Sequence, residues 1–498
     1  MLKRSAILVH RWLGVALCLV FMLWFSSGIG MMYWEFPEVT AADRLERAPA
    51  LKPAAIQLSP REAFSALGTS AAPARVRLNT FDGRPVYRFL TDRQETIVYA
   101  DTGARQVEVS RELMQRVASA WTRQPPGAAA VDEMSDVDQW TVQGSIRRLR
   151  PMLKFSFPSG EAVYVSHASG EVVQYTTTAS RLGAYLGPIP HWLYFTPLRR
   201  HQQQWSDIVI WTSGIGTVTA LLGIAIALWT LSPSPRYRDA GKRTRIPYRG
   251  SKRQHAILGL IFGVSAATWA FSGMLSMDPF GPVGGQRGGG RDIEQALRAP
   301  LSIDAFAVRH PREALAAVPG MDVRELELAS VAGEPVYLAT LAGGRTWILG
   351  LDGRASAEFD RKQLAGIVAS AAGPAGLAEL RELTQYDRYY RDRRRTLPLP
   401  VLLARLNDAD ETRYYIDPRT ARIVGRYSSS DWAGRWLYHG LHSLDFPWLY
   451  NHRPAWDIVM IAFMIGGTAL CVTSVILAWS VVGRRWVTMP VSSKESKR

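Results

Sequence analysis

The chain has 498 residues, a formal net charge of +16 and only two cysteines, Cys18 and Cys471. This count excludes iron–sulfur clusters and cysteine-based zinc sites, and without a Cys-x-x-Cys-His motif any haem would be bound non-covalently. The positive charge does not indicate a nucleic-acid-binding domain, because much of it gathers in short segments beside apolar stretches.

Four apolar stretches are long enough to cross a membrane, which takes about 20 residues. None has a Lys, Arg, Asp or Glu in its interior. The first follows Lys3 and Arg4, as a signal peptide would, but it is too long for one and has a copy in mid-chain. The sequence therefore predicts a polytopic membrane protein with spans at about 12–34, 208–231, 256–277 and 458–483.

Basic residues favour one orientation. The connector 232–253 has eight Lys or Arg residues against one acid, Asp239, and the N-terminus and the tail are basic as well. The positive-inside rule places all three in the cytoplasm and the two long segments on the other side. The expected division is 1–34 (N-terminus and first span), 35–205 (outer region), 206–231 (span), 232–253 (connector), 254–277 (span), 278–455 (outer region), 456–483 (span) and 484–498 (tail).

Each outer region predicts two small α+β units, in which a helix precedes a hairpin. Alternating apolar residues around a turn, mostly with Asp or Gly, indicate the hairpins, and Pro at a first helical position marks two of the helices. The Gly-rich run 281–291 predicts a flexible linker. We expect hairpins at 98–107, 163–172, 346–359 and 414–423, and helices that begin at Pro60, Arg111, Pro311 and Arg361.

Six of the nine histidines fall into three pairs at matching positions of two repeats. His10 and His255 are followed at identical offsets by the same Leu, Gly, Trp, Ser and Gly residues. His191 and His201 recur, with their neighbours, as His442 and His452. The chain is therefore an internal duplication. Histidine is costly near lipid, so histidines kept in register indicate a function.

These features resemble the PepSY-associated transmembrane family: the H-x-x-L-G…S-G span, the His-x-Leu entrance to the next span, and the helix-plus-hairpin outer units. The resemblance covers essentially the whole chain. It implies an α-helical membrane bundle of four tandem-duplicated transmembrane helices with two extracytoplasmic α+β PepSY-like domains. It further implies a multi-pass protein of the bacterial inner membrane, with cytoplasmic termini and periplasmic loops. The family includes iron-regulated inner-membrane proteins, and the members that this chain resembles include ferric-siderophore reductases that carry b-type haem between their spans.

The paired histidines suit such a haem on physical grounds. Neutral imidazole is a common haem ligand, and bis-histidine ligation needs two histidines from facing helices. If a pseudo-two-fold axis along the membrane normal relates the repeats, each position faces its own copy. We therefore expect two haem b groups, one between His10 and His255 near the cytoplasmic face and one between His191 and His442 near the outer face. The matched glycines Gly14, Gly28, Gly259 and Gly273 allow a macrocycle to approach, or simply pack helices.

Four further residues are secondary candidates beside the outer pair: His201, His452, Arg200 and Arg453. Arginines there, including Arg199, can bind haem propionates or an anionic chelate, or merely reach for the polar interface. His439 is an alternate ligand without a copy, since Pro188 stands at its matching position. The Arg/Tyr-rich run 388–395 is either an anion-binding segment or a solvated loop.

Different classes of function remain open. The first is a haem-dependent transmembrane oxidoreductase that passes electrons to a ferric siderophore or similar chelate; the donor is external, cytoplasmic or a quinol, because the chain has no flavin or nicotinamide motif. The second is a non-enzymatic, membrane-anchored PepSY sensor or regulatory binding protein whose histidines only pack. A transporter is a third, although four spans are few and none is Pro-broken. The expected partners are membrane lipid, the electron donor and the chelate, and not nucleic acid.

Overall fold

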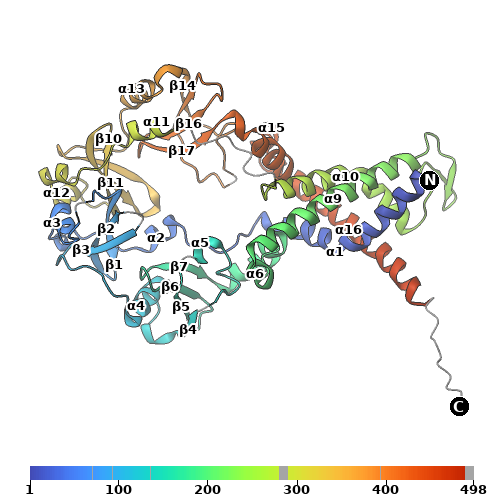
Figure 1. Cartoon of the computed structure of the whole chain (residues 1–498), viewed down its shortest axis with the longest axis horizontal. Coiled ribbons are helices and arrows are strands. Elements are labelled where there is room, and N and C mark those ends of the chain that lie inside the picture. The colour runs from blue at the N-terminus through green and yellow to red at the C-terminus, as the bar shows by residue number, and fades with distance from the viewer. Residues whose placement is uncertain are drawn as a thin grey trace, which may run out of the picture.

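The computed structural model describes residues 1–69, 71–91, 94–134, 136–147, 149–279, 290–392 and 394–487. A bundle of long helices forms one end of the molecule, and four β-rich units form the other (Figure 1). The chain passes from the bundle to the β-rich end and back, and then repeats this course. The fold therefore follows the duplication in the sequence.

Four helices in the described part of the chain are long and apolar enough to cross a membrane: α1 (Leu2–Met31), α9 (Gln202–Thr230), α10 (Ser251–Leu275) and α16 (Ala455–Val487). The helices α1 and α10 begin before their apolar stretches, so His10 and His255 lie inside helices rather than at their first turns. Neighbouring helices touch in the cyclic order α1, α9, α10, α16, which places α1 and α10 opposite each other across the bundle.

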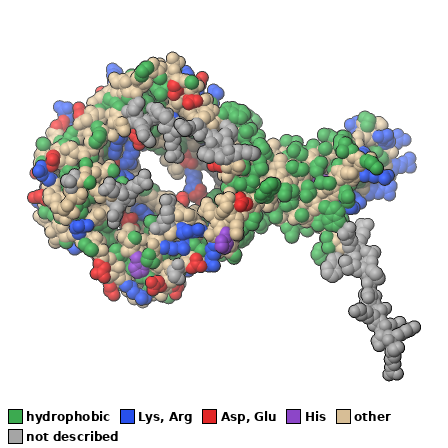
Figure 2. All heavy atoms as spheres, viewed as in Figure 1, with side chains coloured by type: hydrophobic (Ala, Val, Ile, Leu, Met, Phe, Trp, Pro, Cys, Tyr) green, Lys and Arg blue, Asp and Glu red, His purple; other side chains and the backbone are tan. Residues whose placement is uncertain are grey.

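Small residues let these helices approach closely. On α16, a Cβ at Gly467 would overlap the ring of Phe25, and a Cβ at Gly466 would overlap the ring of Phe262. Hydrophobic side chains cover the visible face of the bundle, while Lys and Arg gather at its tip, away from the β-rich units (Figure 2). That tip includes the basic connector, which forms the hairpin β8 (Tyr237–Asp239) and β9 (Lys242–Thr244).

The β-rich end contains four units, and each has the expected helix before its strands. Their helices are α3 (Pro60–Ser65), α4 (Arg111–Thr122), α12 (Pro311–Ala316) and α13 (Arg361–Ala371). Hairpins lie at all four predicted places, although the first is reduced beyond Tyr99 to a single bridge between Val98 and Arg105. Most of the strands that precede these hairpins were not predicted.

The strands fall into three sheets at this end. The second unit has β4 (Ala130–Met134), β5 (Met152–Ser156), β6 (Ala162–Ser166) and β7 (Val172–Thr176), in that order. The fourth has β14 (Leu377–Leu383), β15 (Val401–Leu406), β16 (Arg413–Asp417) and β17 (Arg422–Tyr427), also in order. The first unit has β1 (Arg75–Phe81), β2 (Arg84–Thr91) and β3 (Gln94–Tyr99), and the third has β10 (Val323–Val331), β11 (Glu334–Leu341), β12 (Thr346–Gly350) and β13 (Ala355–Ser356).

The first and third units share one seven-stranded sheet, which the sequence did not predict. The strands β1 and β10 pair antiparallel, with Val76 opposite Leu328 and Leu78 opposite Leu326. Pairing satisfies two sheet edges that would otherwise expose unpaired backbone groups. One hydrophobic core then runs through both units. The two outer regions are therefore joined, and the four units lie in a ring around an opening (Figure 2).

Short helices carry the chain between the β-rich units and the bundle. In the first repeat, α6 (Thr178–Leu186), α7 (Pro188–His191) and α8 (Thr196–Arg199) lead into α9. In the second, the π-helix η7 (Ala433–Gly440), α14 (Leu441–Ser443) and α15 (Pro447–Tyr450) lead into α16. Most of the expected linker 281–291 and the end of the tail lie outside the described residues. Three other short helices are α2 (Ala41–Arg47), α5 (Gly144–Arg147) and α11 (Gly290–Leu297).

Candidate functional site

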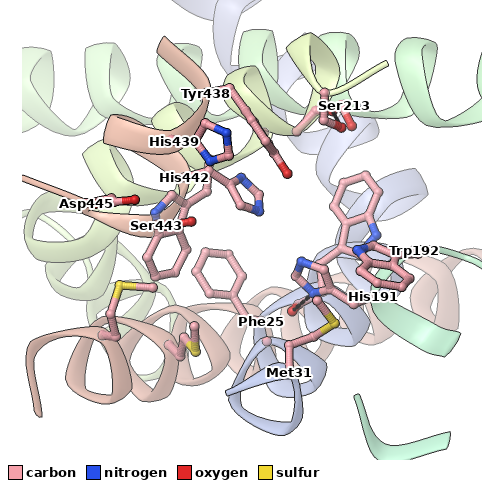
Figure 3. A pocket seen from close by; sticks show the side chains of 18 of the residues that line it. Phe25, Met31, His191, Trp192, Ser213, Tyr438, His439, His442, Ser443 and Asp445 are labelled. Carbon is pink, nitrogen blue, oxygen red and sulfur yellow. Dashed lines mark hydrogen bonds between the residues drawn. The ribbon is translucent and has the colours of Figure 1, made fainter. Parts of the chain in front are cut away.

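His191 and His442 lie together where the β-rich units meet the bundle. Their ring centroids are 6.0 Å apart and the ring planes meet at 70° (Figure 3). Two residues after each histidine, a leucine has a left-handed backbone, with φ of 52° at Leu193 and 46° at Leu444. This conformation is uncommon for leucine. Its recurrence shows that both repeats turn the chain in the same way directly after the histidine.

The Nδ1 atoms of this outer pair are held by the preceding long helix of each repeat. Nδ1 of His191 lies 3.1 Å from the carbonyl oxygen of Trp24 and 3.3 Å from Ser27 Oγ. Nδ1 of His442 lies 3.0 Å from Oγ of Ser272, the copy of Ser27, and that hydroxyl donates its own proton to a backbone carbonyl. Because these oxygens accept, Nδ1 carries the proton in both rings and Nε2 has the lone pair. No described residue hydrogen-bonds to either Nε2.

The inner pair is built in the same way. His10 on α1 and His255 on α10 face each other across the bundle, with ring centroids 6.3 Å apart and planes at 44°. Nδ1 of His10 lies 3.0 Å from the carbonyl oxygen of Thr219, and Nδ1 of His255 lies 3.2 Å from Thr473 Oγ1, whose proton goes to a backbone carbonyl. Again Nε2 is left with a lone pair and, among the described residues, has no hydrogen-bond partner.

A cavity of about 470 Å³ adjoins the outer pair, a size within the range of ligand pockets. His191 and His442 line it, together with the matched glycines Gly28 and Gly273. A Cβ on Gly28 would lie 3.7 Å from Cε1 of His191, and one on Gly273 would lie 3.9 Å from Cε1 of His442. These glycines therefore keep the space beside each imidazole clear. The rest of the lining is mostly apolar and includes Trp24, Phe25, Trp269 and five methionines, Met31, Met32, Met277, Met460 and Met464.

Both separations fit two axial ligands of one haem iron. A metal–imidazole bond of about 2 Å and a ring radius of about 1 Å place a metal about 3 Å from each ring centre. A metal midway between rings 6.0 or 6.3 Å apart meets this condition on both sides. A hydrogen bond from the other ring nitrogen is the usual support for a ligating histidine, and all four rings have one. Within the described ranges, no group of three or more His, Cys, Asp or Glu side chains could hold a bare metal ion.

Burial keeps the outer imidazoles neutral. The helices α7 and α14 lie outside the four apolar helices, and burial lowers the pKa of His191 to about 4. Burial and, to a smaller extent, His191 lower the pKa of His442 to about 3. Neutral imidazole is the form that binds metals.

The secondary candidates do not line the cavity. His201 is exposed at the start of α9, and the exposed His452 is 2.7 Å from the carbonyl oxygen of Trp448. The two arginines pair with acids instead, Arg200 with Asp136 at 3.0 Å and Arg453 with Asp457 at 2.8 Å. Arg199 stacks over Trp205, 4.2 Å from the ring centroid. None of them is positioned to bind at the outer pair.

Other polar residues line the cavity in their place: Arg391, Asp392, Tyr438, His439, Ser443 and Asp445. Figure 3 shows Tyr438, His439 and Asp445 on the side of the cavity that carries His442. The sequence offers His439 as an alternate ligand without a copy, three residues before His442, and the structure places it on the cavity wall. For the run 388–395 nothing in the sequence indicates that Arg391 and Asp392 reach this cavity.

Neither a protein-family model nor a curated protein matches this chain. The geometry of the two histidine pairs is therefore the main evidence for a function.

Proposed function

We propose that this protein is a haem b carrier of the bacterial inner membrane that passes electrons outward to a ferric siderophore or a similar iron chelate. The observation that carries the proposal is the repeated imidazole pair, with ring centroids 6.0 and 6.3 Å apart. Each ring is protonated at Nδ1 and has no hydrogen-bond partner at Nε2 among the described residues. His191 and His442 would hold the outer haem, and His10 and His255 the inner one. Haem bound there supplies one-electron redox chemistry.

The two pairs are spaced along the bundle as a transmembrane carrier requires. His10 and Ser27, which contacts His191, are 17 residues apart on α1, so the pairs are about 25 Å apart along the axis. That is close to the thickness of the hydrocarbon core, about 30 Å. Aromatic rings pack inside the bundle both at the outer cavity, where Phe25 lies 5.4 Å from Trp269, and closer to the inner pair, where Phe262 lies 6.1 Å from Phe463.

The finer assignments rest on the resemblance and on charge. The basic tip of the bundle supports a cytoplasmic location for that end, and with it a periplasmic location for the β-rich, PepSY-like units. The outer cavity then adjoins the periplasmic units, where a chelate would arrive. The electron donor would be a separate cytoplasmic protein or a quinol that reaches the inner pair.

The test is to purify the full chain in detergent from haem-replete cells and to titrate it with reductant. We expect a red protein with two haems per chain and a Soret band that shifts on reduction. Each of His10→Ala, His255→Ala, His191→Ala and His442→Ala should lower the haem-to-protein ratio while the protein remains folded.

The matched controls are His201→Ala and His452→Ala, which change a repeated histidine outside the cavity and should leave both haems in place. A colourless wild-type preparation would contradict the proposal and favour the alternative, a membrane-anchored sensor or binding protein. Full haem content in all four pair variants would contradict the ligand assignment.

A further inference from the structure

The two repeats differ on one wall of the outer cavity. The pair itself is duplicated, but Tyr438, His439 and Asp445 match Gly187, Pro188 and Tyr194 in the first repeat. Arg435, beside this wall, matches Ala184. A wall needed only to hold the paired histidines would be expected in both repeats. The polar wall of the second repeat therefore points to a further role.

Two arginines converge on one loop at this wall. The guanidinium of Arg391 pairs with the carboxylate of Asp445, and its Nη1 also lies 3.3 Å from the Asp445 carbonyl oxygen. Nη2 of Arg435 donates to the same carbonyl oxygen at 2.9 Å. Arg435 is almost completely buried, with 1% of its surface exposed, and stacks 4.1 Å from the ring centroid of Trp436. Arg391 and Asp445 line the cavity itself.

The positive charge at this place is only partly balanced, since Asp387 attracts Arg435 without forming an ion pair in the described part of the chain. Asp445 is one carboxylate for two guanidinium groups. Asp392, which also lines the cavity, is occupied by its own loop, because it accepts hydrogen bonds from backbone N–H groups of Thr396 and Leu397. Burial and, second, the neighbouring Arg435 lower the pKa of Arg391 to about 10. An additional anion would relieve this repulsion.

Two buried guanidinium donors at the same place, Nε of Arg391 and Nη1 of Arg435, have no hydrogen-bond partner in the described part of the chain. The acceptor Oδ1 of Asp445 has none there either, but an anion would not satisfy it, so only the two donors favour an anion. Unpaired buried donors and acceptors are costly, and arginine matches carboxylates with two parallel N–H groups. We infer that Arg391, supported by Arg435, forms a carboxylate-binding subsite on the outer cavity.

The carboxylate has two possible sources, which share this chemistry. One is a propionate of the outer haem, and the other is a carboxylate-bearing ferric chelate. Both rest on the proposed function, because both assume haem at the outer pair. The subsite itself is testable without haem, since free citrate carries the same groups.

The test compares Arg391→Gln with wild type, with Arg391→Lys as the conservative variant. The matched control is Arg453→Gln, a partly exposed arginine of the same boundary that already pairs with Asp457. Haem and haem dimethyl ester, which lacks free carboxylates, are titrated into the haem-free full chain, and citrate is titrated into the same protein by calorimetry. A charged hydrogen bond is worth about 1.5–3 kcal/mol, which corresponds to about 10- to 100-fold in affinity.

If the source is a propionate, wild type prefers haem to the dimethyl ester by at least about tenfold, and Arg391→Gln abolishes that preference. If the source is a chelate, Arg391→Gln leaves the preference for haem unchanged but weakens citrate binding. It then also raises KM for the reduction of ferric citrate, and not for that of the uncharged ferric acetohydroxamate. No change in either measurement, or an equal change in Arg453→Gln, overturns the subsite. A chain that never binds haem would contradict the proposed function. Citrate binding to wild type and to Arg391→Gln would still show whether Arg391 forms a carboxylate-binding subsite.

Discussion

The indole Nε1 of Trp205 donates a hydrogen bond of 2.8 Å to the carbonyl oxygen of Trp192. The second repeat has the same bond at 2.9 Å, from Trp456 to Ser443. In each case the acceptor directly follows a histidine of the outer pair, and the donor lies at the start of the next membrane helix. This bond therefore fixes the histidine loop to the bundle in both halves.

Trp456→Phe should loosen the outer haem while the fold is preserved. Phenylalanine keeps most of the ring packing but leaves the Ser443 carbonyl oxygen without its indole donor, which costs about 1–3 kcal/mol at a buried site. We expect the haem held by His442 to dissociate about tenfold faster or more, measured by transfer to an excess of apomyoglobin. Trp205→Phe should act in the same way. Trp211→Phe, at a ring that is 70% exposed on α9, is the control and should have no effect.

The pairing of the histidines follows from the sequence because a duplicated bundle places each residue opposite its copy. The matching positions in the two repeats thus predict that His10 pairs with His255 and His191 with His442. The structure brings both pairs together. The role of these residues as haem ligands stays a prediction. The helices α3, α4, α12 and α13 of the β-rich units were also predicted. In α3 and α12 the local signal is a Pro at the first helical position.

The remaining features depend on long-range contacts. The hydrogen-bond partners of the imidazoles come from other parts of the chain, such as Thr219 for His10, and no spacing rule reveals them. The shared sheet requires β1 to meet β10 across about 250 residues, and the sequence of neither strand indicates its partner. Arg391 reaches the cavity through the fold of the fourth unit, so its run of arginines was indistinguishable from a solvated loop.

Gly223→Ala should remove the inner haem selectively. A Cβ at this position on α9 would lie 2.7 Å from Cε1 of His10, so the ring must move. We expect the haem-to-protein ratio to fall from two towards one, with the outer haem signals unchanged in electron paramagnetic resonance. Gly483→Ala is the control, because a Cβ there meets no atom within 4 Å in the described structure. Loss of the outer haem alone in Gly223→Ala would contradict this assignment.

Acid should release the outer haem and destabilise the haem-free protein. The pKa values of His191 and His442 are lowered by burial to about 4 and about 3, whereas an unfolded histidine has a pKa of about 6.5. The unfolded state therefore binds more protons below pH 6.5, so stability is full above that pH and falls as pH drops towards 4. In the haem-bound protein, protons compete with iron for Nε2, and haem should be lost as pH approaches about 4.

The measurement is thermal unfolding of the haem-free chain between pH 8 and 5, a range above the titration of ordinary carboxylates. Tm should be flat from pH 8 to 7 and should decline below 6.5. In the double variant His191→Ala/His442→Ala this decline should be smaller but not absent, because two of the groups that take up protons on unfolding are removed while His439, whose pKa burial also lowers to about 4, remains. Equal slopes in both proteins would show that these histidines do not titrate as their burial indicates.

Glu327→Gln should destabilise the ring of β-rich units. The Glu327 carboxylate on β10 is buried and forms ion pairs with three arginines. The N–O distances are 3.0 Å to Arg75 of β1 and 2.5 Å to both Arg298 after α11 and Arg422 of β17. It thus joins the first, third and fourth units. Removing its charge leaves three guanidinium groups without their shared anion, which we expect to cost about 3–5 kcal/mol. Thermal unfolding of the full chain should show a lower Tm, with haem content unchanged.

The pH dependence of the same group provides a second measurement. Burial raises the pKa of Glu327, but Arg422, Arg75 and Arg298 outweigh it and lower the pKa to about 2. Because the folded pKa lies below the unfolded value, the stabilisation is complete above about pH 4.5 and is lost as pH falls from there towards 2. Glu327→Gln should lose this acid-sensitive step. Asp304→Asn, which breaks the exposed pair with Arg61, should cost less than about 1 kcal/mol. A similar loss of Tm in both variants would mean that Glu327 does not join the units, since only the buried carboxylate has charged partners in three of them.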